Sequence, residues 1–241
     1  MNNIHKNIQE AISNGKKLLA ILIDPDKFLV ENANSFMKKV NTSIATHIFV
    51  GGSVVNAGVT DGLVYEIKKH TELPIVLFPG DITQITNKAD GLLFLSLLSG
   101  RNPDYLIGKH VEAVSELSKT QLDIISTGYI LIESGRETAV QQVTETQPMS
   151  REDIQNIADT AVAGQLLGMK LIYLEAGSGA MEPVALNIIN AVRNVLAIPL
   201  IVGGGIKNKT DLENAYDAGA DIVVIGNAFE NDEAFFDDLQ K

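Results

Sequence analysis

The stretch PLIVGGGIKNKTDLENAYDAGADIVVIGN, residues 199–227, contains the pattern that decides the fold. An apolar run ends in three glycines, a segment with helical spacing follows, and a second apolar run ends in Gly226 and Asn227. Neither apolar run alternates with polar residues, which is typical of parallel strands that are buried on both faces. The stretch therefore predicts two parallel strands joined by a helix.

The same unit recurs along the whole chain. Apolar runs predict eight strands, within 18–24, 47–53, 74–80, 91–97, 123–129, 170–177, 199–205 and 221–227. Helices are expected between most of them, over 29–40, 60–69, 103–118, 151–168, 182–197 and 210–218. Eight strands that alternate with helices in 241 residues are typical of the α/β class and of a closed (β/α)₈ barrel, or TIM barrel, here as a single domain over 1–241. The alternative is an open doubly wound sheet.

Several helix ends are marked in the sequence. Ser150 and Asp153 have the spacing of a capping box, and the same spacing recurs from Thr210, so these residues are expected to open helices. Gly168 and Gly219 stand where helices are expected to end, because glycine accepts the left-handed backbone that often closes a helix.

Two segments depart from the regular alternation. The segment DITQITNKAD, residues 81–90, leaves room only for a degenerate third helix, and a missing outer helix would leave a groove in the barrel wall. The segment 130–149, which follows the fifth strand, is too long for a simple loop. Its alternation around Ser134 and Gly135 indicates a hairpin-like insertion, interpreted as a lid or an oligomer contact, with a hairpin of no function as the alternative.

Composition and charge exclude several classes of function. The net charge of −11 disfavours nucleic-acid binding, and the absence of cysteine excludes disulfides and thiolate chemistry. The N-terminus lacks the layout of a signal peptide, and the longest uncharged apolar stretch, 91–100, is too short to span a bilayer. We therefore expect a cytoplasmic protein without a membrane span, in which backbone N–H groups, helix N-termini or a metal hold any anionic substrate.

Glycine-rich strand ends indicate a phosphate site. Active sites of such barrels lie at the C-terminal ends of the strands, and glycine turns after the last two strands often hold phosphate. Here these turns contain Gly203, Gly204, Gly226 and Asn227. The sixth strand ends in YLEAGSGA, residues 173–180, which adds further donors from Gly177, Ser178 and Gly179. The alternative is a set of tight turns without a ligand.

Glu175 stands out within this anion-binding region because its charge has the wrong sign to bind phosphate. We interpret it as the acceptor of a hydrogen bond from a substrate hydroxyl, which it orients and deprotonates. Tyr173 lies two residues earlier and supplies a phenol to the same site. The alternative for Glu175 is an ion pair with a lysine such as Lys207.

Asp24 is the candidate metal ligand. It ends the first strand and precedes Pro25, which fixes the following turn. One carboxylate together with a diphosphate is a common way to bind Mg²⁺, because that ion takes much of its coordination from substrate phosphates. Ser53, at the end of the second strand, could add a hydroxyl oxygen. The alternatives are a capping or turn role for each residue.

Together these stretches resemble the geranylgeranylglyceryl phosphate synthase family, specifically its second subgroup, which includes bacterial members similar to heptaprenylglyceryl phosphate synthase. The resemblance covers nearly the whole chain and rests on LIDPDK (22–27), VGGS (50–53), RNPDYLIGKH (101–110), STGYILIESGRETAVQQV (126–143), YLEAGSGA (173–180), VGGGIK (202–207) and IGNAF (225–229). The chain departs from many archaeal members at Leu22, where they have lysine, and at Ser53, where threonine is usual.

The resemblance implies a prenyltransferase that joins a polyprenyl diphosphate, expected to be geranylgeranyl diphosphate, to sn-glycerol 1-phosphate. It implies that Asp24 and Ser53 hold Mg²⁺ and that Glu175 and Tyr173 are catalytic. It also implies a homo-oligomer, dimeric or hexameric. The residues implied to cradle glycerol 1-phosphate are Tyr173, Leu174, Glu175, Ala176, Gly177, Ser178, Gly179, Gly203, Gly204, Gly226 and Asn227. The prenyl tail is expected in the groove left by the degenerate third helix, with the fourth strand as part of its wall.

Two other functions remain open at this point. A sugar-phosphate isomerase or epimerase would use Asp24 and Glu175 as an acid and base, and would have a polar tunnel in place of an apolar groove. A non-catalytic phosphate-binding barrel would need neither carboxylate.

Overall fold

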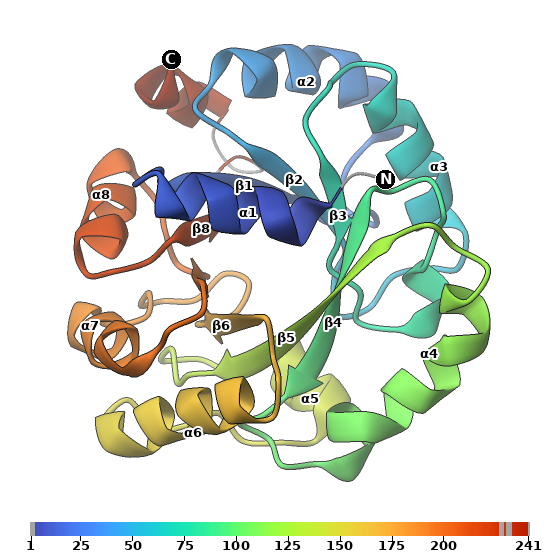
Figure 1. Cartoon of the computed structure of the whole chain (residues 1–241). Coiled ribbons are helices and arrows are strands. Elements are labelled where there is room, and N and C mark those ends of the chain that lie inside the picture. Colours follow the sequence, from blue (N-terminus) through green and yellow to red (C-terminus); the bar gives the residue numbers. More distant parts are fainter. Residues whose placement is uncertain (1–2, 227–228, 230–232, 241) are drawn as a thin grey trace.

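The computed structural model describes residues 3–226, 229 and 233–240. The parallel strands β1 to β8 pair in chain order, and β8 pairs with β1, so the sheet is a closed barrel (Figure 1). The TIM barrel is thereby confirmed and the open sheet is wrong. The strands are β1 (Leu18–Ile23), β2 (His47–Val50), β3 (Ile75–Leu77), β4 (Gly91–Leu97), β5 (Asp123–Leu131), β6 (Leu171–Glu175), β7 (Leu200–Gly203) and β8 (Ile222–Ile225).

Amphipathic helices surround the barrel and bury their apolar faces against it, while a second buried cluster fills its interior. The helices that follow the predicted pattern are α2 (Ala33–Thr42), α3 (Val59–Lys68), α4 (Lys109–Leu117), α6 (Ile154–Leu166), α7 (Leu186–Val195) and α8 (Lys209–Asp217). Short turns of helix occur at η1 (Val30–Asn32), η3 (Asp104–Gly108, a π-helix) and η4 (Glu233–Leu239). Among the described residues, no helix is long and apolar enough to cross a membrane.

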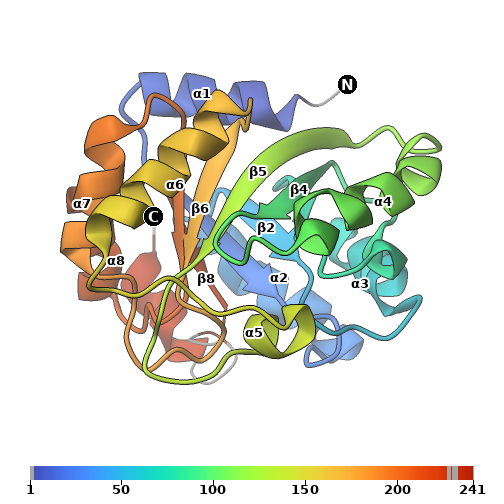
Figure 2. The same cartoon turned by 90° about the horizontal axis from the view of Figure 1, so that it is seen from below.

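An additional helix, α1 (Ile4–Ser13), precedes the first strand and was not predicted. Ile4 and Ile8 are buried with the residues of the barrel interior, and the amide of His5 donates to the carboxylate of Asp123 at the start of β5 (2.9 Å). Figure 2 shows α1 at one end of the barrel and α5 at the other. Because α1 closes the N-terminal end, the C-terminal ends of the strands form the accessible end.

The degenerate third helix is confirmed. A single turn, η2 (Ile82–Gln84), is the only helical element between β3 and β4. The hairpin-like insertion is wrong. Within 130–149 the structure has a loop and the short helix α5 (Ala139–Thr144), and only an isolated parallel bridge joins Ile132 to Met149. Thr138 and Gln141 form a capping box, which satisfies the N-terminal amides of α5 and favours helix over hairpin.

The expected helix starts at Ser150 and Thr210 are also wrong. The side chain of Asp153 caps α6 by accepting from the amide of Asn156, and the side chain of Asn208 caps α8. The expected ends are confirmed, because Gly168 and Gly219 follow these helices with φ angles of +93° and +117°.

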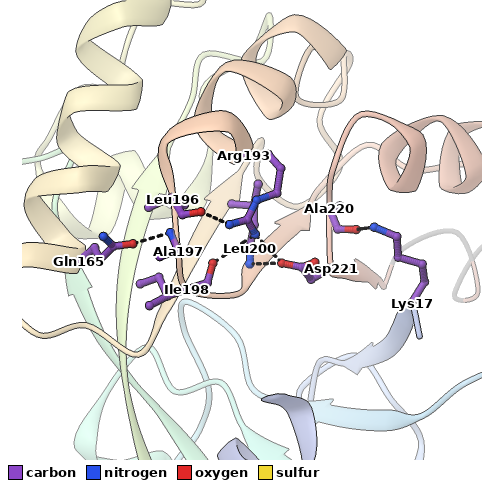
Figure 3. A network of polar contacts seen from close by, with 9 residues as sticks. All are labelled: Lys17, Gln165, Arg193, Leu196, Ala197, Ile198, Leu200, Ala220 and Asp221. Carbon is purple, nitrogen blue, oxygen red and sulfur yellow. Dashed lines mark hydrogen bonds and ion pairs between the residues drawn. The ribbon is translucent and has the colours of Figure 1, made fainter. Parts of the chain in front are cut away.

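A polar network at the N-terminal ends of β7 and β8 fixes that side of the barrel (Figure 3). The Arg193 guanidinium pairs with Asp221 (2.7 Å) and donates to the carbonyls of Leu196 and Ile198. Asp221 also accepts from the amide of Leu200 (2.9 Å). The network joins the end of α7 to two strands and lies at the end opposite to the predicted site, so we assign it to stability.

Candidate active site

Glu175 is the last residue of β6, and its side chain is buried (5% exposed). Its Oε1 accepts from the amide of Gly177 (2.6 Å). Burial raises the pKa of this carboxyl from 4.5 to about 7, although the Gly177 amide and the neighbouring Tyr173 hydroxyl partly oppose the shift. Glu175 forms no ion pair with Lys207, whose ammonium donates to the carbonyl of Met181 (3.3 Å). A carboxyl with this pKa is suited to accept a proton near neutral pH.

The Tyr173 hydroxyl is buried and lies close enough to the Glu175 carboxyl to affect its pKa, but no group among the described residues meets it with the distance and angle of a full hydrogen bond. It faces β7, where a methyl group added to Gly203 would lie 2.4 Å from it. The ring stacks on Phe78 (5.4 Å between centroids) and packs edge to face against Tyr129 (5.3 Å). A buried hydroxyl without a partner is costly, so its position beside Glu175 indicates a ligand that completes its hydrogen bonding.

The glycine turns after β6 and β7 lie against each other. Gly177, Gly179 and Gly204 have φ angles of +99°, +68° and +82°, which other residues rarely adopt. A methyl group on Gly204 would lie 2.5 Å from Glu175 Oε1 and 2.7 Å from the amide nitrogen of Gly177. The exposed Ser178 and Gly179 complete this turn. The structure thus brings the predicted phosphate-binding backbone and the predicted base together.

Four predicted cradle residues differ from the glycines of the turns. Leu174 and Ala176 are buried in the cluster between the strands and the helices, so only their backbone can take part in binding. Gly226 follows β8 and packs near Leu22 of β1. Asn227 lies outside the described residues, so its predicted role stays a prediction.

Asp24 follows β1, and its carboxylate lies beside the end of β2. A methyl group on Gly52 would be 3.2 Å from Asp24 Oδ1. Gln84 of η2 fixes the backbone of Gly52, donating to its carbonyl (2.9 Å) and accepting from its amide (3.3 Å). Ser53 is half-buried and is the next residue, so the two predicted metal ligands lie in one region. Within 3–226, 229 and 233–240, no group of three or more acidic or histidine side chains gathers to hold a metal.

A cavity of about 940 Å³, its open mouth included, extends from Gly52, Ser53 and Gly80 between η2, β4, α4 and α5. It occupies the position that a full third helix would fill, as the sequence predicts. Strand β4 supplies much of its wall, which is mainly apolar. The apolar lining residues are Phe78, Pro79, Ile82, Ile85, Leu92, Leu93, Phe94, Leu95, Leu97, Tyr105, Ala113, Leu117, Tyr129, Val140 and Val143.

Comparison with known proteins agrees with this geometry. The model of the PcrB family matches residues 12–241. This chain belongs to the PcrB family. A geranylgeranylglyceryl phosphate synthase of Flavobacterium johnsoniae is 57% identical over 237 residues, 98% of each chain, and one of Pyrococcus abyssi is 39% identical over 225 residues, 93% of this chain and 88% of that protein.

Solved structures of related proteins also resemble this chain over nearly its full length. The crystal structure of (S)-3-O-geranylgeranylglyceryl phosphate synthase from Thermoplasma acidophilum, in complex with sn-glycerol-1-phosphate, superposes with a TM-score of 0.92. It is 30% identical, and the match covers 99% of this chain and 96% of that one. The wild-type enzyme from Thermoplasma volcanium gives a TM-score of 0.91 at 32% identity, over 98% of this chain and 94% of that one.

Three residues of the PcrB-family site were given no role by the sequence analysis. Arg136, in the segment before α5, donates from Nη1 to the carbonyl of Gly179 (3.1 Å), and the methyl group of Thr138 lies against Gly177. The segment therefore covers the glycine turn of β6. His110 of α4 lines the cavity, with its Nε2 3.1 Å from Ser96 Oγ, and burial lowers its pKa. All three residues lie in stretches that carry the family resemblance, 101–110 and 126–143, but no spacing or composition singles them out.

Proposed function

We propose that this chain is a prenyltransferase that joins a polyprenyl diphosphate to sn-glycerol 1-phosphate, forming an ether-lipid precursor and diphosphate. The observation that carries the proposal is a buried carboxyl, Glu175, against glycine-lined turns, with Tyr173 of the same strand packed on the wall of an apolar cavity. The turn suits a phosphate and the cavity suits an isoprenoid tail. The names of the relatives and the geranylgeranyl chain they specify support the same reaction.

Glu175 acts as the base in this proposal. Amides of the glycine turns hold the phosphate of glycerol 1-phosphate, while Glu175 and Tyr173 orient its far hydroxyl. That hydroxyl gives its proton to the Glu175 carboxylate as its oxygen bonds to the first carbon of the prenyl chain. The bond from this carbon to the diphosphate breaks, and the diphosphate leaves with the electron pair.

The chain's own residues also fit a magnesium ion at the diphosphate. Asp24 offers one carboxylate next to Gly52, the residue before Ser53, and Mg²⁺ commonly binds through one or two carboxylates together with substrate phosphates. When bound there, Mg²⁺ would offset the negative charge of the leaving group. Phe78 and Tyr129 line the cavity next to Tyr173 and exclude water from the reacting carbon.

The rival functions fit the cavity less well. A sugar-phosphate isomerase needs a polar tunnel, whereas the cavity that opens beside Ser53 is lined mainly by apolar side chains. A non-catalytic barrel has no use for a buried carboxyl whose pKa lies near neutrality. We further propose a cytoplasmic homo-oligomer, dimeric or hexameric, and light scattering of the purified protein measures that state.

A transfer assay tests the reaction. Radiolabelled sn-glycerol 1-phosphate is incubated with Mg²⁺ and with prenyl diphosphates of increasing length, and label is measured in the organic phase. We expect transfer with geranylgeranyl diphosphate, and loss of transfer in Glu175→Gln and Asp24→Ala. Glu182→Gln, in the exposed part of the same loop, is the matched control and should retain activity. If no chain length gives transfer by the wild-type protein, the proposed function is wrong.

A further inference from the structure

The Asp24 carboxylate is already engaged by groups of this chain. Its Oδ2 lies 2.7 Å from the ammonium of Lys27, and its Oδ1 accepts from the amide of Asp26 (3.1 Å). The ion pair is accessible, because the Lys27 side chain is 52% exposed and that of Asp24 is 18% exposed. A cation of the protein thus contacts the carboxylate that the proposed metal needs.

The turn that carries this pair is fixed, whereas the lysine stem can rotate. The carbonyl of Asp24 accepts from the amides of Lys27 (3.2 Å) and Phe28 (3.0 Å). The Asp26 carboxylate accepts from the amide and side chain of Asn56, so it is directed to the loop before α3. An exposed ion pair contributes little to stability, so Lys27 can exchange this partner for another at small cost.

We propose that the Lys27 ammonium pairs with the Asp24 carboxylate in the substrate-free protein. When a metal binds that carboxylate, the ammonium moves to the diphosphate. The inference rests on the proposed function. Because the chain has a net charge of −11, it repels a diphosphate overall, so a positively charged side chain at the site itself is needed to bind one. A diphosphate held through a metal on Asp24 would lie near that carboxylate, and Lys27, which already contacts it, could then reach the diphosphate.

Lys109 is a second candidate cation, and it is less suited to this role. It lines the cavity wall, but its ammonium pairs with Glu112 (3.1 Å) and Asp81 (3.8 Å). These two carboxylates raise its pKa and hold it on the outer edge of η2 and α4. Lys27 shares its carboxylate partner with the proposed metal, so its release is coupled to metal binding.

The exchange predicts two effects of opposite sign. Removing the Lys27 charge removes a competitor from Asp24, so a divalent cation should bind the substrate-free protein more tightly. The same change removes a ligand of the diphosphate, so diphosphate should bind more weakly in the presence of metal. If Lys27 only stabilised the turn, its replacement would weaken the binding of both the metal and the diphosphate, or would change neither.

Binding of Mn²⁺ to the substrate-free protein, measured by electron paramagnetic resonance, tests the first effect. We expect Lys27→Gln to bind Mn²⁺ about two- to five-fold more tightly than wild type, the factor that corresponds to a weak exposed ion pair. Lys27→Arg keeps the pair and should match wild type, as should Lys88→Gln, whose lysine pairs with the remote Asp61. Asp24→Ala should lose the site.

Calorimetric titration of inorganic diphosphate at saturating Mg²⁺ tests the second effect. We expect Lys27→Gln to bind about ten-fold more weakly, in line with the loss of one hydrogen bond to a charged group. Equal Mn²⁺ affinity in Lys27→Gln and wild type, or unchanged diphosphate affinity, overturns this inference and leaves the prenyltransferase proposal intact. No Mn²⁺ binding to any substrate-free variant also overturns the exchange, because the metal then reaches Asp24 only together with the diphosphate.

Discussion

Replacing Glu175 with glutamine should stabilise the fold while it removes activity. Glutamine is isosteric, and its carbonyl oxygen can still accept from the Gly177 amide, so the hydrogen bond of 2.6 Å is retained. The substitution removes only the charge that the barrel interior disfavours.

The size of the effect follows from the pKa of Glu175, which rises from 4.5 to about 7 on folding. Because the folded value is the higher one, the protonated buried carboxyl has its full stability below about pH 4.5, and that stability is lost as pH rises through 7. A shift of about 2.5 pH units corresponds to about 3 kcal/mol. Above pH 8, the free energy of unfolding of Glu175→Gln should therefore exceed that of wild type by up to about 3 kcal/mol, which corresponds to about 6–12 °C in Tm.

Thermal unfolding of both proteins at pH 5 and pH 8.5 measures the difference. We expect the Tm of Glu175→Gln to differ little from that of wild type at pH 5 and to be clearly higher at pH 8.5; this difference in Tm is the gap. Glu182→Gln makes the same change of charge at an exposed side chain, so its gap from wild type should not change with pH. A gap for Glu175→Gln that is equal at both pH values would refute the reasoning, since burial of the charge is its only source.

Four other changes test separate parts of the molecule. In the transfer assay, kcat/KM should rise about ten-fold per pH unit up to about pH 7 and then level off, as Glu175 loses its proton; a flat profile contradicts its role as base. Arg136→Ala removes the contact to Gly179 and should raise the KM for glycerol 1-phosphate several-fold with little change in kcat, measured by initial rates. Arg193→Met breaks the network of Figure 3 and should lower the free energy of unfolding by about 3 kcal/mol while kcat/KM is unchanged. Ala113→Leu narrows the cavity and should shift the preferred prenyl diphosphate to a shorter chain in a length series.

The strands and most helices could be predicted because burial on both faces of a parallel sheet leaves continuous apolar runs in the sequence. Helix α1 was missed although Ile4, Ile8, Ala11 and Ile12 have helical spacing, because it precedes the first strand and the alternation of strands and helices does not require it. The insertion was mistaken for a hairpin because its alternation was given more weight than the Thr138 and Gln141 capping box that starts α5.

The site was predicted from residue types at strand ends, which the closed barrel necessarily brings to one end. Glu175, Tyr173 and the glycine turns could be identified in that way. The Arg136 contact depends on how a loop folds over a distant turn, and the Lys27 pair on a rotamer, so neither leaves a periodic signal.

The seal formed by α1 and the opening left by the missing third helix together determine how an oily substrate can enter. Because α1 covers the N-terminal end and side chains fill the interior, a long hydrocarbon chain cannot pass along the barrel axis. A prenyl chain can instead enter from the side, past η2, and the ether product, which carries that chain and one phosphate, can leave through the same opening. We therefore expect the prenyl substrate and the ether product to use the same opening of the barrel.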